Sequence, residues 1–120
     1  MSADALKSLV ESYPALRAVA FADLSTRMVL VSESRTPMLR EAFQALCLHG
    51  GALLTAVDSD PIDPDTACDA AISVDTEGMS VFLRVPGAPD DALCCLCDPT
   101  VEVDAFLADA RACLTQLAGG

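Results

Sequence analysis

Six cysteines and one histidine are the residues of this 120-residue chain with the most versatile chemistry. Thiolates and imidazoles bind zinc, and a cysteine beside a histidine can act as a nucleophile. The pattern Cys94-Cys95-x-Cys97 is not the C-x-x-C pair that zinc and thioredoxin-like sites use. His49 precedes two glycines and has no cysteine or carboxylate at a fixed spacing. We therefore expect no catalytic residue, no metal and no cofactor.

The placement of the thiols predicts that they are reduced and buried. Five of the six cysteines lie inside segments with a hydrophobic pattern, where a free cysteine packs as a small apolar side chain. The N-terminus lacks the basic and apolar regions of a secretory signal, so we expect a cytoplasmic protein. A cysteine enzyme that uses His49 as its base is the less favoured alternative.

The elements that would position these residues follow the order helix, two strands, helix, three strands, helix. Residues 16–23 and 92–97 are apolar on both faces, so each strand needs cover on both sides and should lie inside the sheet. The remaining elements are expected as a helix from Ser2 to Tyr13, strands over 28–33, 70–76 and 79–85, turns over 23–27 and 86–91, a linker over 58–65, and a final helix after Pro99 that Gly119-Gly120 caps.

The second helix is expected to begin at Thr36-Pro37, as N-cap and first helical residue. One stripe of this helix carries apolar residues at positions 39, 43, 46, 50, 53 and 57, and small residues lie beside that stripe. Such a helix either lies tightly on the sheet or meets a copy of itself. The Gly50-Gly51 pair costs about 2 kcal/mol against two alanines, which makes a break there plausible.

Composition and charge narrow the function class. The chain is 52% hydrophobic, yet it has no run of about 20 apolar residues that could span a bilayer, so we expect one domain over 1–120 without membrane insertion. The formal charge of −11 repels nucleic acid and anionic lipid over most of the surface. A basic surface on a protein partner is the better match, although high charge also keeps a small apolar protein in solution.

The chain resembles the roadblock family, named for a dynein light chain and including bacterial regulators of Ras-like GTPases. The resemblance rests on the element order, on Leu6-Lys-Ser-Leu-Val10, on Pro14 followed by the apolar strand ending at Asp23, and on the closing strand and helix over 92–117. It implies an α/β fold, roadblock- or profilin-like, with a single five-stranded antiparallel sheet of order 2-1-5-4-3. One helix lies on one face and two on the other.

The family resemblance also implies a site. Family members dimerise through their third strands and second helices, which would place Ala42, Ala45, Ala52, Ala70, Ile72 and Val74 in a homodimer interface. The third strand carries no proline or lysine that would discourage edge pairing. The implied function is non-catalytic: a regulatory or scaffolding module that binds a protein, plausibly a small Ras-like GTPase. Arg35 and Arg40, near the start of the second helix, could contact such a partner or be ordinary solvated charges.

A second function class stays open. Related profilin and PAS-like folds include sensory modules that hold a small ligand between sheet and helix. Such a cavity needs a few convergent polar groups. The strand hydroxyls of Ser32, Ser73 and Ser80 are the only candidates at plausible positions.

Overall fold

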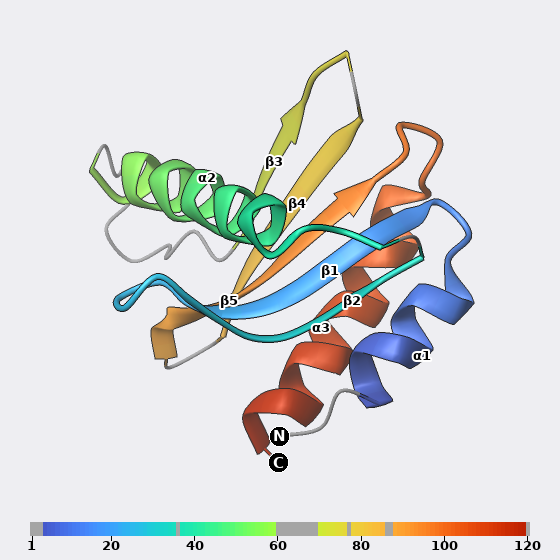
Figure 1. The fold of residues 1–120 in the computed structure, drawn as a ribbon, viewed down its shortest axis with the longest axis horizontal. Helices are drawn as coiled ribbons and strands as arrows, with labels where there is room; N and C mark the ends of the chain where they lie inside the picture. Colours follow the sequence, from blue (N-terminus) through green and yellow to red (C-terminus); the bar gives the residue numbers. More distant parts are fainter. Residues whose placement is uncertain (1–3, 36, 60–69, 77, 86–87, 120) are drawn as a thin grey trace.

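Five strands form one antiparallel sheet, with one helix on one face and two helices on the other (Figure 1). The computed structural model describes residues 4–35, 37–59, 70–76, 78–85 and 88–119. The elements are α1 (Asp4–Ser12), β1 (Leu16–Asp23), β2 (Met28–Ser34), α2 (Arg40–Ser59), β3 (Ala70–Val74), β4 (Met79–Val85), β5 (Ala88–Cys97) and α3 (Val103–Gly119). The strand order β2-β1-β5-β4-β3 confirms the expected topology.

Strands β1 and β5 lie adjacent at the centre of the sheet, as their two apolar faces predicted. Their register pairs Val19 with Cys95 and Phe21 with Leu93. These larger side chains face α1 and α3, whereas β1 presents only alanines toward α2, at positions 18, 20 and 22. The small side chains let α2 approach the sheet closely.

Helix α2 runs through both glycines without a break, so the predicted interruption is wrong. At position 50 an added Cβ would lie 2.4 Å from Cδ1 of Phe82, a ring that is completely buried on β4. Gly50 therefore lets the helix rest on that ring. At Gly51 the nearest atom to an added Cβ is Leu24 Cδ2, at an ordinary 3.7 Å.

The start and the buried side of α2 also differ from expectation. The helix begins at Arg40, because the Leu39 carbonyl accepts the first backbone hydrogen bonds, from Ala42 and Phe43. Leu39 itself is 73% exposed. The buried stripe consists of Phe43, Cys47, Gly50 and Leu54, so Phe43 and Gly50 of the predicted stripe are buried as expected. Leu46 and Leu53 of the predicted stripe are partly buried and pack against the same cluster.

Two strand ends differ from the prediction, one because backbone pairing extends further and one because a turn begins earlier. Strand β5 begins at Ala88, inside the predicted turn, since Ala88 pairs with Val85 of β4 and Asp91 pairs with Asp23 of β1. Strand β3 ends at Val74, where Asp75 and Gly78 close the turn by hydrogen bonds. In the turn after β1, Ser25 donates to Asp23, and Arg27 occupies the left-handed region at a φ of 60°.

Several predicted features fall outside the described residues. They are the Ser2 and Thr36 caps, Cys68, most of the 58–65 linker and Gly120. Asp58 and Ser59 form the end of α2 rather than a linker, and Gly119 belongs to α3. Among the described helices, none is long and apolar enough to cross a membrane.

Candidate protein-binding surface

The exposed side of α2 carries the small residues that the sequence singled out. Ala42, Ala45 and Ala52 are all exposed, on the helix side that points away from Phe43 and Leu54. A large apolar residue that the sequence analysis did not single out lies among them: Leu48 is 49% exposed. Leu48 stands outside the 43-47-50-54 stripe, and that spacing could have identified it as outward-facing.

Strand β3 forms one edge of the sheet and is the shortest of the five strands. It pairs with β4, and no other strand of the described residues covers its outer side. Ile72 and Val74 are 44% and 65% exposed. They point to the α1 and α3 side of the sheet, together with the partly buried Ala70, since Ile72 pairs with the core residue Val81 of that side.

His49 connects the helix to this edge strand. Its Nε2 lies 3.3 Å from the Ser73 hydroxyl on β3, and its ring packs edge-on against Phe82 at 5.7 Å between centroids. The imidazole is exposed and lies in the middle of a continuous helix rather than near a bend. With Ser73 as its hydrogen-bond partner, His49 holds the side of α2 against β3.

We name these residues together the α2–β3 surface: Ala42, Ala45, Leu48, His49, Ala52, Ile72 and Val74. The alanines and Leu48 lie on one face of the sheet, and Ile72 and Val74 lie on the other. The His49–Ser73 contact links α2 to β3, whose outer edge separates the two sets. The surface is thus apolar on both sides of an uncovered strand edge, which is the geometry that accepts a further strand.

Arg35 lies apart from this surface. It follows β2, and its Nε donates to the Leu16 carbonyl at 2.8 Å while its Nη2 donates to the carbonyls of Tyr13, at 2.6 Å, and Val10. The guanidinium thereby ties the end of α1 to the start of β1. This geometry favours a structural role for Arg35, and its contact with a partner stays a prediction.

Arg40 also lies away from the α2–β3 surface, toward the opposite edge of the sheet. It is exposed at the first residue of α2 and borders a hollow of about 310 Å³ beside β2. The hollow is otherwise lined by Val29, Leu30, Val31, Ser32, Met38 and Phe43. Arg40 is thus available to a partner at the β2 side of the helix, and such a contact stays a prediction.

The five described cysteines are buried and unbridged. A hydrogen bond with Cys47 and burial raise the pKa of Cys94 well above its ordinary value, and burial does the same for Cys95. Burial and the charge of Asp98 raise the pKa of Cys97 to about 12. The same hydrogen bond lowers the pKa of Cys47. The thiols of Cys94, Cys95 and Cys97 remain protonated at neutral pH, and a protonated thiol is a poor nucleophile and metal ligand.

Two other site classes find no support in the described part of the chain. No three side chains of the types that bind metals gather there. The middle of the contact between α2 and the sheet, where a ligand would lie in a profilin- or PAS-like sensor, is filled by Phe43, Cys47, Phe82 and Cys94, with Gly50 against the Phe82 ring.

Sequence comparison does not identify relatives: no protein-family model matches the chain, and no curated protein matches it either. Solved structures are informative. A Roadblock/LC7 domain from Streptomyces avermitilis superposes with a TM-score of 0.82 at 7% identity, over 94% of this chain and 91% of that one. The gliding protein MglB from Thermus thermophilus gives 0.77 at 13% identity, over 96% and 84%.

More distant structures share the architecture as well. A profilin, LokiProfilin2, solved in complex with rabbit actin, gives a TM-score of 0.60 at 12% identity, over 98% of this chain and 97% of that one. At such identities the likeness shows the fold alone. The chain has the roadblock fold, as the pattern of its strands and helices predicted.

Proposed function

We propose that this protein is a non-catalytic regulatory or scaffolding module that acts as a homodimer and binds a protein partner. The α2–β3 surface is the observation that carries the proposal. It combines an uncovered strand edge, exposed apolar residues on both sides of that edge, and a helix whose outer side is mostly alanine.

In the proposed dimer, two copies of β3 pair antiparallel and extend the sheet across both chains. The α2 helices then come side by side on one face, where Ala45 and Ala52 allow a close approach. Ile72 and Val74 of the two chains meet on the other face. Such a contact would bury about 1,200–2,000 Å², the usual range for a stable pair.

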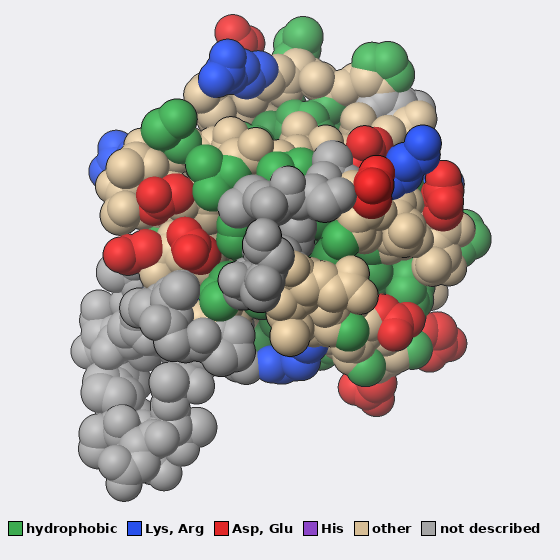
Figure 2. All heavy atoms as spheres, turned by 90° about the horizontal axis from the view of Figure 1, so that it is seen from below, with side chains coloured by type: hydrophobic (Ala, Val, Ile, Leu, Met, Phe, Trp, Pro, Cys, Tyr) green, Lys and Arg blue, Asp and Glu red, His purple; other side chains and the backbone are tan. Residues whose placement is uncertain are grey.

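The partner is proposed from resemblance and from charge. The roadblock family includes bacterial regulators of Ras-like GTPases, and a fold by itself does not determine a function. The net charge adds an independent argument, because a formal charge of −11 attracts the protein to basic surfaces. Figure 2 shows acidic side chains spread over one face of the molecule rather than gathered in a single patch. We therefore propose a small Ras-like GTPase that approaches with a basic face.

The proposal is tested with purified Ras-like GTPases from the source organism, each combined in turn with the wild-type protein. Nucleotide hydrolysis or exchange by one of them should change on addition, and the monomerising substitution Ala45→Glu should weaken the effect. Ala108→Glu, at an exposed position of α3, is the matched control. Charge reversal of Arg40 should also weaken the effect.

Two results would reject the functional proposal. No response from any of these GTPases would remove the GTPase as the partner class. Turnover of a small substrate by this protein alone, lost on substitution of Cys95, Cys97 or His49, would show an enzyme instead.

A further inference from the structure

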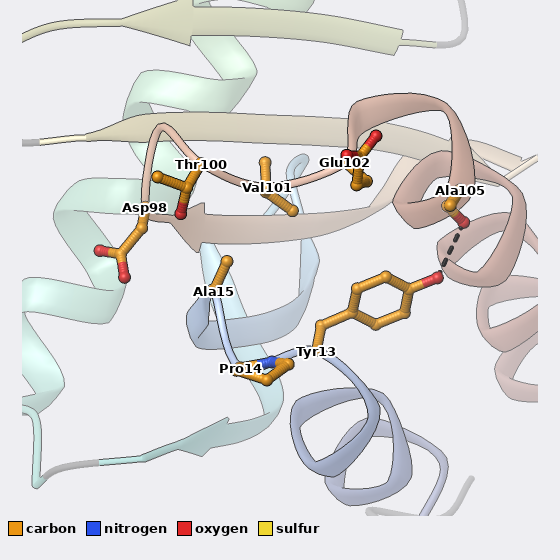
Figure 3. A pocket seen from close by; sticks show the side chains of 8 residues that line it. All are labelled: Tyr13, Pro14, Ala15, Asp98, Thr100, Val101, Glu102 and Ala105. Carbon is orange, nitrogen blue, oxygen red and sulfur yellow. Dashed lines mark hydrogen bonds between the residues drawn. The ribbon is translucent and has the colours of Figure 1, made fainter.

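A hollow of about 450 Å³ opens on the side of the sheet that faces away from α2 (Figure 3). It lies where the connection from α1 to β1 faces the connection from β5 to α3. Tyr13, Pro14 and Ala15 line it from the first connection, and Asp98, Thr100, Val101, Glu102 and Ala105 line it from the second connection and the first turn of α3. None of these residues belongs to the α2–β3 surface.

The walls of this hollow are held by contacts within the chain. The Tyr13 hydroxyl reaches the Ala105 carbonyl at 2.9 Å and the Asp109 carboxylate, and its ring meets Phe106 edge-on at 5.3 Å between centroids. The Asp98 amide donates to the Ala15 carbonyl at 2.8 Å, which joins the two connections. The shape of the hollow is therefore formed before any partner arrives.

The lining divides into an apolar part and a carboxylate part. The side chains of Pro14, Ala15 and Val101 are apolar, and the Tyr13 ring adds an aromatic wall. The two ionisable side chains that line it besides Tyr13 are both carboxylates, Asp98 and Glu102, and Figure 3 shows them on either side of Val101.

One of the two carboxylates already has a guanidinium beside it. Arg17 Nε lies 3.8 Å from Asp98 Oδ1, and both side chains are about half exposed, at 50% and 48%. This ion pair is long and open to solvent, so it contributes little and yields readily to a better-placed cation. Glu102 is exposed and accepts the first helical hydrogen bond of α3 through its backbone carbonyl, which leaves the carboxylate available.

We propose that this hollow binds the side chain of a lysine or arginine from a protein partner. The aliphatic part of such a side chain would lie against Tyr13, Pro14 and Val101, and its cationic head would reach Glu102. Asp98, on the other side of Val101, adds negative charge to the hollow. Long basic side chains bind to proteins in this way: their aliphatic part packs against apolar surface, and their charged end pairs with an opposite charge. An aromatic ring beside the cation adds cation–π attraction. The site does not depend on the dimer, because its lining lies outside the α2–β3 surface.

The test uses the 120-residue chain and two small probes that differ in charge and share a shape. N-acetyl-arginine methylamide is titrated against ¹⁵N-labelled protein, and N-acetyl-citrulline methylamide is the uncharged control. Arginine should shift the amide signals of residues 100–105 and Tyr13 saturably at millimolar concentration, and citrulline should not. Added salt should weaken the binding, because the contact is largely electrostatic.

Substitutions separate the hollow from general surface charge. Glu102→Gln should weaken arginine binding about two- to fivefold, whereas Asp104→Asn, an exposed acid two residues away that does not line the hollow, should leave it unchanged. Ala105→Leu should fill the hollow and abolish binding, with Ala108→Leu as its matched control. Equal shifts with arginine and citrulline, or equal losses with Glu102→Gln and Asp104→Asn, would overturn the proposal.

Discussion

Gly50 on α2 and Phe82 on β4 are in such close contact that a single methyl group has no room between them. An added Cβ would lie 2.4 Å from Cδ1 and 2.8 Å from Cε1 of the buried ring. A ring with no exposed surface cannot swing aside, so the helix would have to lift from the sheet. This contact sets the distance between α2 and the sheet, and therefore the position of the α2–β3 surface.

Exchanging each of the two neighbouring glycines for alanine should have opposite effects. Alanine gains about 1 kcal/mol over glycine in a helix interior, and overpacking a core costs about 1–3 kcal/mol. We expect Gly50→Ala to lower the free energy of unfolding by up to about 2 kcal/mol, and Gly51→Ala to raise it by up to about 1 kcal/mol. Urea unfolding measures both. If both variants are stabilised, the close contact with Phe82 is wrong.

Removing the Arg35 side chain should destabilise the fold. Its guanidinium satisfies carbonyls at the end of α1, and hydrogen bonds to charged groups contribute about 1.5–3 kcal/mol each in favourable cases. Arg35→Ala should therefore lower the free energy of unfolding by about 1–3 kcal/mol. Arg40→Ala, at an exposed position, should change it by no more than about 0.5 kcal/mol. If the two variants are equally stable in thermal or urea unfolding, Arg35 is an ordinary solvated charge and has no structural role.

The chain contains one tyrosine and no tryptophan, so tyrosinate absorbance reports on Tyr13 directly. The hydrogen bond to Asp109, with burial and the charge of that carboxylate, raises the pKa of Tyr13 to about 12. A raised pKa means that folding favours the neutral phenol, so this contribution to stability is present below about pH 10 and is lost between about pH 10 and 12.

An absorbance titration of the folded protein should then give a midpoint near pH 12, and Asp109→Asn should move the midpoint toward 10. The urea-unfolded chain supplies the reference. A wild-type midpoint near 10 would show that Tyr13 and Asp109 do not interact in solution.

The thiols should be reduced and shielded. Protein purified without reductant should have the mass of six free thiols and no bound zinc, since the five described cysteines are buried and the pKa values of Cys94, Cys95 and Cys97 are raised. An aromatic disulfide reagent should react with these five only as the protein unfolds. Stoichiometric zinc, or a mass two units low from an intramolecular bridge, would contradict this.

The apolar pattern predicted the centre of the molecule best. Strands β1 and β5 lie adjacent and inside the sheet because both their faces are apolar, and β4 has the predicted bounds of 79–85. The place of such strands in the sheet depends on which faces are buried, and the apolar residue types show those faces directly. The roadblock resemblance then supplied the order of all five strands.

The side of α2 that is buried was predicted less well, for a physical reason. Leu46 and Leu53 pack against the core as predicted, but Leu39 is exposed, and Cys47 and Leu54 complete the buried stripe. Gly50 meets a ring contributed by a strand 32 residues later. Contacts between distant segments also determine the hollow at Tyr13, which needs α3 beside α1. Local periodicity carries no information about such contacts.

Solution mass tests the proposed homodimer most directly. Light scattering at micromolar concentration should give twice the chain mass of 12.5 kDa for the wild type, and Ile72→Lys should shift the mass toward one chain. Leu30→Lys is the matched control, because Leu30 on the opposite edge strand is also 44% exposed. It should leave the dimer intact. A wild type of 12.5 kDa, or equal masses for the two lysine variants, would contradict a dimer formed through β3.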